Sequence, residues 1–250
     1  MKVNMKNCDT IIESNLAYQS QIMDCRNCPN MDNSSFCSLK KDEAEAFNEK
    51  KTSKFYKKGS IVFYENEISK GLYLVNKGKL KMYKTLADGN EQIMKLAATG
   101  DIIGYRGLLG NGKYIASAET IEDSIICFIP KYYLFELLTK NISLTLKLFD
   151  IFANDLAYVE NKALRYLQKS SREKLAESLL ELYHSYGLDQ LGFINIKLRR
   201  EELASLCGMA SETVVRILKE FEENNILSLS LKKIGIKNLE ELTRIAHLEA

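Results

Sequence analysis

Four side chains with complementary binding chemistry recur on one face of a predicted helix in the last fifth of the chain. Glu212, Val215, Arg216 and Lys219 fall on one stripe at about 100° per residue, almost opposite an apolar stripe. Arginine can donate two hydrogen bonds to guanine, glutamate can accept one from cytosine, and valine can contact a thymine methyl group. The spacing therefore predicts a surface that reads base-pair edges. A solvated polar face on an ordinary helical hairpin is the alternative.

The stripe needs a supporting element, and the sequence predicts a second helix just before it. Leu203 and Leu206 lie three residues apart in that segment, and Gly208 can take the left-handed conformation that ends a helix. Two short helices joined by a glycine turn are typical of a helix-turn-helix. The apolar face of the second helix comprises Val214, Ile217, Leu218 and Phe221.

Residues 208–219, Gly-Met-Ala-Ser-Glu-Thr-Val-Val-Arg-Ile-Leu-Lys, resemble the recognition element of the Crp/Fnr superfamily of bacterial transcription regulators. That element has the pattern glycine, three variable residues, Glu-Thr, two residues and arginine. The resemblance implies that Glu212 and Arg216 read bases, with neighbouring side chains beside them. The expected DNA contacts are Arg199, Ser211, Glu212, Thr213, Val215, Arg216 and Lys219.

A second constellation consists of cysteines. Two residues separate Cys25 from Cys28, eight residues separate Cys28 from Cys37, and Cys127 lies in a predicted strand just before Phe-Ile-Pro. The layout resembles the fumarate and nitrate reduction branch of the superfamily, although that branch has five residues in the second gap. The resemblance implies an oxygen- or nitric-oxide-labile 4Fe-4S cluster held by four thiolates of suitable softness. Its expected ligands are Cys25, Cys28, Cys37 and Cys127.

Two alternatives to the cluster stay open. Zinc accepts the same four thiolates, and a Cys-x2-Cys pair is equally typical of structural zinc sites. In the other alternative Cys127 is a small buried strand residue and the N-terminal cysteines bind no metal. Six cysteines without an apolar signal segment in any case favour metal, cluster or redox chemistry over structural disulfides.

Between these constellations, residues 51–131 form short runs rich in β-branched and aromatic residues, punctuated by glycine. Turns spaced by roughly eight to twelve residues predict an antiparallel sandwich or barrel. The runs resemble the strands of the cyclic-nucleotide-binding β-roll. Relatives that bind cyclic AMP carry Gly-Glu-Leu-Gly and Arg-Ser, where this chain has Gly-Tyr-Arg-Gly at 104–107 and Tyr-Ile-Ala-Ser at 114–117. A buried phosphate without a cation is unfavourable, so cyclic AMP is not expected.

A helix free of proline and glycine is predicted over residues 144–168. Its apolar residues alternate three and four apart, as in a coiled-coil seam, although packing on the chain's own β-roll is the alternative. A parallel homodimer through this helix would suit a palindromic site on double-stranded DNA. The predicted seam comprises Phe149, Phe152, Leu156, Val159, Ala163 and Tyr166.

The predicted fold class is α+β, with a β-roll, a long dimerisation helix and a winged helix-turn-helix. A short strand over 193–198 and a two-stranded wing over 226–236 complete the last module. The expected domains are a cysteine-containing region at 1–50, the β-roll at 51–140, the helix at 141–169 and the DNA-binding domain at 170–250.

Composition narrows the function. The net charge of +2 requires any basic footprint for DNA to be local, around Arg199 and Lys219. The chain has two histidines, no Ser/His/Asp set and no phosphate-cradling glycine loop, so no enzyme is predicted. The absence of an apolar run of about 18 residues and of a signal segment predicts a cytoplasmic protein without a membrane span.

The expected function is a homodimeric, sequence-specific transcription regulator whose sensor region controls DNA binding. RNA polymerase is a further candidate partner. Two alternatives remain: a regulator of the same fold that senses another small molecule or none, and a β-roll that serves as a protein-interaction module.

Overall fold

The computed structural model of the chain describes Phe36, Leu39 and residues 41–247. By its internal contacts the chain divides into two compact units. Unit 1 takes in the described residues up to Met82 together with Leu96–Ala153, and unit 2 takes in Tyr83–Lys95 and the chain from Asn154 onward. No helix in the described part of the chain is long and apolar enough to span a membrane.

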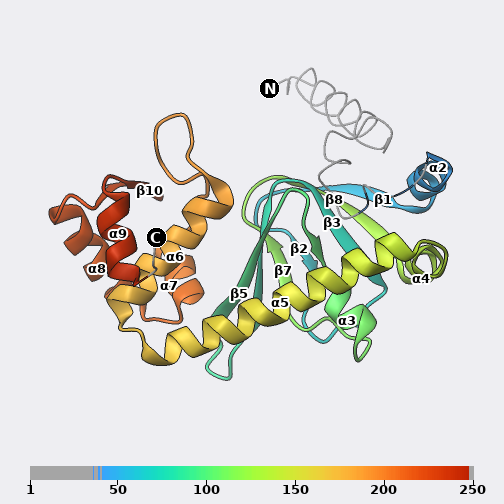
Figure 1. The fold of residues 1–250 in the computed structure, drawn as a ribbon, viewed down its shortest axis with the longest axis horizontal. Helices are drawn as coiled ribbons and strands as arrows, with labels where there is room; N and C mark the ends of the chain where they lie inside the picture. Colours follow the sequence, from blue (N-terminus) through green and yellow to red (C-terminus); the bar gives the residue numbers. More distant parts are fainter. Residues whose placement is uncertain (1–35, 37–38, 40, 248–250) are drawn as a thin grey trace, which may run out of the picture. The chain divides into compact units, whose positions relative to one another are not determined.

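Short strands in two antiparallel sheets dominate the N-terminal half (Figure 1). One four-stranded sheet has the order β1-β8-β3-β6 and the other β2-β7-β4-β5. The strands are β1 (Thr52–Tyr56), β2 (Ile61–Phe63), β3 (Gly71–Lys77), β4 (Lys79–Thr85), β5 (Glu91–Ala98), β6 (Ile102–Ile103), β7 (Ser117–Thr120) and β8 (Ser124–Pro130). The helices of this half are α2 (Lys41–Lys50), α3 (Tyr105–Leu109) and α4 (Lys131–Lys140). The arrangement confirms the predicted β-roll.

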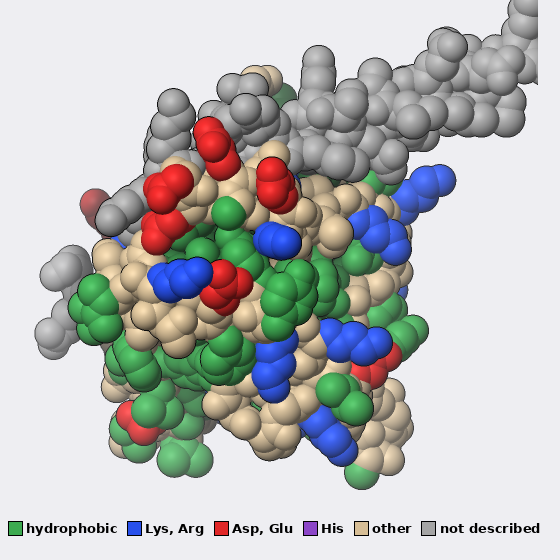
Figure 2. Space-filling view, turned by 90° about the vertical axis from the view of Figure 1, so that its right-hand side faces the viewer, with side chains coloured by type: hydrophobic (Ala, Val, Ile, Leu, Met, Phe, Trp, Pro, Cys, Tyr) green, Lys and Arg blue, Asp and Glu red, His purple; other side chains and the backbone are tan. Residues whose placement is uncertain are grey.

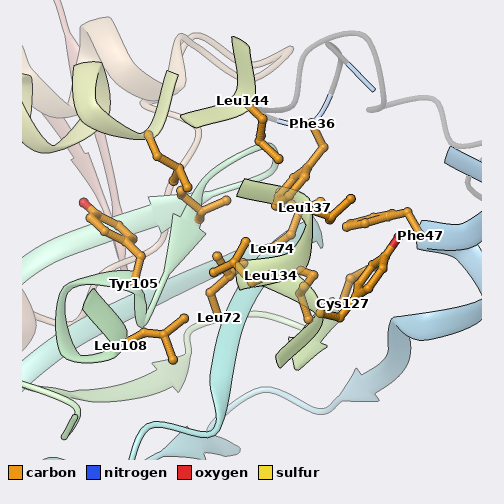
Figure 3. Packing of buried hydrophobic residues seen from close by; sticks show 14 residues of the cluster. Phe36, Phe47, Leu72, Leu74, Tyr105, Leu108, Cys127, Leu134, Leu137 and Leu144 are labelled. Atoms are coloured by element: carbon orange, nitrogen blue, oxygen red, sulfur yellow. The ribbon is translucent and has the colours of Figure 1, made fainter. Parts of the chain in front are cut away.

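Alternation along the strands separates two hydrophobic cores. Leu72, Leu74 and Cys127 point to one side of the first sheet, where α2, α4 and the start of α5 cover it (Figure 3). Val75 and Ile126 point to the other side, into a core shared with the second sheet. This two-sided burial follows from the period of two in a strand, and it explains why β3 and β8 read as continuous apolar runs.

The long helix α5 (Ile142–Gln168) begins two residues before its predicted start. The side chain of Asn141 accepts a hydrogen bond from the backbone N–H of Leu144 at 3.0 Å. Asparagine in this capping position satisfies an N–H that has no partner within the helix.

Unit 2 holds the C-terminal helical module. Ser170 and Glu173 form a capping box at the start of α6, and Gly208 takes the left-handed conformation (φ 62°, ψ 43°) that ends α7. The predicted strand over 193–198 is wrong: only isolated bridges form, from Ile194 to Leu188 and from Phe193 to Gly235. The elements are α6 (Ser171–Tyr186), α7 (Arg200–Cys207), α8 (Ser211–Glu223), β9 (Leu227–Ser230), β10 (Lys233–Ile236) and α9 (Leu239–Ala246).

Candidate DNA-binding surface and sensor core

The turn between α7 and α8 sets the direction of α8. The backbone N–H of Gly208 donates to Ser205 O at 3.2 Å, and that of Met209 donates to Ala204 O at 3.0 Å. These bonds occupy carbonyls at the end of α7 and let the chain turn directly into α8. The predicted apolar face of α8 is confirmed as buried, with at most 2% exposure for each of Val214, Ile217, Leu218 and Phe221.

Burial of that face leaves the opposite face of α8 in solvent. Glu212, Val215 and Arg216 are exposed, and among the described residues the side chain of Lys219 makes one long ion-pair contact, of 3.9 Å with Glu223. Within the described part of the chain, neither Glu212 nor Arg216 takes part in an ion pair or a side-chain hydrogen bond. Ser211 and Thr213, at the start of the helix, are partly exposed. The helix thus presents one acceptor, one forked donor and one apolar group on adjacent turns.

Two arginines flank the start of α7, and the structure distinguishes their roles. Arg199 is exposed and donates from Nη2 to Glu202 Oε1 at 3.1 Å. Arg200 is more buried, donates to the backbone O of Leu231 at 3.2 Å, and has its pKa lowered by burial. Arg200 therefore ties α7 to the wing turn, whereas Arg199 can reach a ligand in solvent.

Helix α6 contacts α8 through a pair of side chains that the sequence analysis did not predict. Arg172 Nε donates to Glu220 Oε1 at 2.7 Å, and its guanidinium lies 5.2 Å from the centre of the Phe221 ring. Arg172 and Glu220 are 48 residues apart, so no local periodicity could have paired them. The contact joins α6 to the last turn of α8.

The predicted seam of α5 falls on two faces. Phe149, Leu156, Val159 and Ala163 are exposed. Phe152 instead lies edge-on to the Tyr105 ring, with ring centres 5.0 Å apart. In the same way the Tyr166 hydroxyl is 3.2 Å from Ser178 Oγ of α6. Phe152 and Tyr166 therefore pack within their own chain, while pairing through the whole seam stays a prediction.

Two of these exposed seam residues, Phe149 and Leu156, lie on a line with three further exposed apolar residues of α5, Ile142, Leu146 and Leu167. The gaps along the line are four, three, seven and eleven residues, which fit a four-and-three pattern whose remaining positions are Ala153, Glu160 and Ala163. Hydrophobic side chains also gather on the face of unit 1 that Figure 2 shows. We call the five residues the α5 line. The predicted seam did not include the two ends of this line, Ile142 and Leu167. The predicted helix began only at residue 144, and Tyr166 was the last residue of the predicted seam.

Cys127 lies in the helix-side core of the first sheet, with 3% exposure (Figure 3). Its Sγ is 3.3 Å from the Oγ of Ser53, its cross-strand partner on β1. Phe36 and Phe47 belong to the same buried cluster. Among the described residues no set of three potential metal ligands comes together. The other predicted ligands, Cys25, Cys28 and Cys37, lie outside the described residues.

The turn that binds the ribose in cyclic-AMP-binding relatives has different chemistry here. Gly104 has φ 83°, and Tyr105 after it is buried in the helix-side core rather than offering a carboxylate. Arg106 is exposed. Ser117 Oγ accepts a hydrogen bond from the backbone N–H of Glu65 at 3.0 Å. These residues give the turn a packing role.

Comparison with known proteins agrees with both halves of the chain. A cyclic nucleotide-binding domain model matches residues 53–141, and a Crp-like helix-turn-helix domain model matches residues 173–245. The fumarate and nitrate reduction regulatory protein of Yersinia pestis is 28% identical over 193 residues, 76% of each chain. The regulatory protein HlyX of Actinobacillus pleuropneumoniae is 27% identical over 190 residues, 74% of this chain and 78% of its own. The structure of FixK2 from Bradyrhizobium japonicum superposes with a TM-score of 0.71 at 26% identity, over 80% of this chain and 99% of that one.

Proposed function

Because the chain belongs to the Crp/Fnr family of DNA-binding transcription regulators, which are not enzymes, we propose that it binds a palindromic DNA site as a homodimer. In this proposal each protomer places α8 in a major groove, and the two grooves lie one helical turn apart. The exposure of Glu212 and Arg216 on α8, without partners in the described part of the chain, is the observation that carries the proposal.

Each exposed group of α8 has a distinct role in base recognition. The guanidinium of Arg216 can donate two hydrogen bonds to O6 and N7 of one guanine, and the carboxylate of Glu212 can accept from N4 of cytosine. The methyl groups of Val215 suit contact with a thymine methyl. Lys219 and Arg199, which are also exposed, would contact phosphates and fix the register without reading sequence.

The α5 line is the proposed dimer contact. Exposed apolar side chains at alternating spacings of four and three residues pack into the matching side chains of a second helix. Leaving residues such as Phe149 and Leu167 in water is unfavourable, and a parallel pair of helices would bury them around a twofold axis. That axis would relate the two copies of α8 as a palindrome relates its half-sites.

Selection of DNA from a random library with the purified full-length protein tests the proposal. We expect enrichment of an inverted repeat whose half-sites are centred about 10 base pairs apart. A matched selection with Arg216→Ala should lose preference at one position in each half-site. Enrichment of no sequence by the wild-type protein, or of the same sequence by both proteins, would contradict the proposed role of α8.

A second proposal concerns the sensor. We propose that Cys25, Cys28, Cys37 and Cys127 hold a 4Fe-4S cluster. The chemistry of Cys127 fits this group, because its sulfur is a soft ligand in an apolar, water-poor core that shields a cluster from solvent. Phe36, the residue just before Cys37 in the sequence, packs in that same core. A bound cluster would supply an assembly that oxygen or nitric oxide destroys.

Purification without oxygen, followed by visible absorption and by iron, sulfide and zinc analysis, tests the sensor proposal. We expect on the order of four iron and four sulfide per chain in the wild-type protein. Cys127→Ser should lose most of the iron, whereas Cys207→Ala, which removes a buried cysteine of unit 2, should keep it. Zinc in place of iron, or equal iron in both variants, would contradict the proposal.

A further inference from the structure

A pocket of about 600 Å³ opens on the inner side of the first sheet, within unit 1. Alternate residues of three strands line it: Lys54 and Tyr56 of β1, Tyr73 of β3, and Ile126 and Phe128 of β8. The β2–β3 loop contributes Glu67, Ile68 and Lys70, and Thr52 and Tyr114 complete the lining. None of the lining residues belongs to the turn at 104–107, so the pocket is distinct from the ribose-binding turn of cyclic-nucleotide-binding relatives.

The wall of the pocket is aromatic. The Tyr73 ring lies 5.0 Å from that of Phe128, its cross-strand partner, and 5.2 Å from that of Phe63. Phe63 in turn stacks on Tyr114 with ring centres 4.1 Å apart. The Tyr114 hydroxyl donates to Gly71 O at 3.0 Å, which fixes the end of the series. Such a rigid run of rings offers a flat ligand an edge or a face to pack against at little entropic cost.

Glycine at position 71 is required for this wall. A Cβ on Gly71 would lie 2.6 Å from the Phe128 ring and 2.1 Å from the backbone O of Ile129. Both are closer than van der Waals contact allows. A side chain at this position would displace Phe128 from the pocket or β3 from β8.

The mouth of the pocket carries an excess of positive charge. Lys54 and Lys70 are exposed, and neither forms an ion pair with any residue that the structure describes. The ammonium of Lys54 lies 5.0 Å from the centre of the Tyr56 ring. Glu67 is the one carboxylate in the lining, and its Oε2 accepts a hydrogen bond from the backbone N–H of Tyr64 at 3.2 Å. The pocket lining therefore carries two ammonium groups and one carboxylate, and the carboxylate already accepts a hydrogen bond.

The β2–β3 loop, which bears Glu67 and Lys70, is fixed by backbone pairing with the residues before β7. The N–H of Tyr114 donates to Glu67 O at 2.9 Å, that of Asn66 donates to Tyr114 O at 2.9 Å, and that of Ser69 donates to Gly112 O at 2.8 Å. Ile68 is held between these bonds with 71% of its surface exposed. An apolar side chain fixed at the mouth of an aromatic pocket is suited to closing over a ring.

We propose that this pocket binds a small aromatic carboxylate. The ring of the ligand would lie against Tyr73 and Phe128 beneath Ile68, and its carboxylate would accept charge-assisted hydrogen bonds from Lys54 and Lys70. Burial raises the pKa of Tyr73 and of Tyr56, which keeps both hydroxyls neutral near pH 7. Neutral phenols do not repel an anionic ligand. A cationic ligand would meet two ammonium groups, and a neutral one would leave both unpaired.

Calorimetric titration of the full-length protein tests the pocket, with benzoate, phenylacetate and phenylpropionate as probes and phenylpropanol as the neutral match of the last. We expect at least one carboxylate to bind, and phenylpropanol to bind at least about tenfold more weakly than phenylpropionate, since each charged hydrogen bond is worth that order. Replacing both lysines, Lys54→Met with Lys70→Met, should weaken carboxylate binding by at least about tenfold. Lys57→Met, a change at an exposed lysine just beyond β1 and outside the pocket, should leave it unchanged.

A melting curve for each variant separates loss of binding from loss of folding. Phe128→Leu provides a second variant, expected to weaken every carboxylate that the wild type binds while leaving the lysines in place. No binding of any carboxylate at millimolar concentration would overturn the proposal. Equal affinity of the wild type and the double-lysine variant, or equal affinity for phenylpropanol and phenylpropionate, would also overturn it. The titration measures binding alone, so failure of the DNA-binding proposal would leave its result intact.

Discussion

Lys169 Nζ lies 2.9 Å from Glu177 Oε2, and the Glu177 side chain is 2% exposed. The same ammonium donates to the backbone O of Ala246 at 2.8 Å, so one lysine joins the end of α5 to both α6 and α9. Arg165 of α5 contacts the other carboxylate oxygen of Glu177 at 2.5 Å. Lys162 of α5 pairs with Glu181 at 3.1 Å. These contacts hold the last turns of α5 against α6 and α9 of the DNA-binding module. A rotation of this part of α5 would therefore also rotate α6.

Glu177→Ala should destabilise the protein strongly. The change leaves Lys169 and Arg165 beside a buried site without their counter-charge, and removing one partner of a buried pair costs about 3 to 5 kcal/mol of unfolding free energy. The value here should fall toward the lower end, since Arg165 is partly exposed. Denaturant unfolding followed by circular dichroism measures it. Glu136→Ala, which breaks an exposed pair between Glu136 and Lys140, is the control and should change stability little.

Arg216→Ala should cost about 1 to 3 kcal/mol of binding to the selected DNA site and relax the preference at one base position. Lys219→Ala should instead weaken binding to all sequences alike and reduce the salt dependence by about one phosphate contact. Fluorescence anisotropy at several salt concentrations distinguishes the two results. Unchanged affinity of Arg216→Ala for the preferred site would remove Arg216 from base recognition.

The helix-turn-helix could be predicted in detail because its determinants are local. The spacing of Val214, Ile217, Leu218 and Phe221 specifies one buried face, and Gly208 is the residue that tolerates the observed φ of 62°. The strands of the β-roll could be predicted for the same reason, since their β-branched and aromatic composition and their glycine turns are read within a few residues. The exposure of Glu212 and Arg216 then follows from the burial of the opposite face.

The contacts of a residue could not be predicted where its partner lies on another helix or strand. The four-and-three spacing placed Phe152 and Tyr166 in the predicted seam together with Leu156. In the structure, Phe152 instead packs against Tyr105, and the Tyr166 hydroxyl lies beside Ser178 of the same chain. Glu177 sits in an apolar run of α6, and its burial makes sense only with Lys169 and Arg165 opposite. The lining of the aromatic pocket likewise joins residues from β1, β3 and β8, which no local pattern connects.

Leu156→Lys should shift the protein from dimer to monomer. Leu156 lies in the middle of the α5 line, and a lysine there would place two like charges near the proposed twofold axis. Sedimentation velocity over a range of protein concentrations measures the shift. Leu191→Lys is the control, since Leu191 is also an exposed leucine, 74% exposed against 59% for Leu156, and lies in the loop after α6. A dimer that survives Leu156→Lys, or that Leu191→Lys disrupts, would place the contact elsewhere.

Cys207 should resist alkylation in the folded protein. The side chain is buried at the end of α7, and burial raises the pKa of its thiol to about 11. The reactive species is the thiolate, so near pH 8 only about one Cys207 side chain in a thousand would be ionised. The upward shift keeps this fraction small until the pH approaches 11, and the packing around Cys207 also blocks the reagent. Brief treatment with iodoacetamide at pH 8, followed by peptide mass spectrometry, should find Cys207 modified only after denaturation. Modification of Cys207 in the native protein at the rate of a free peptide thiol would show that α7 opens readily from its core.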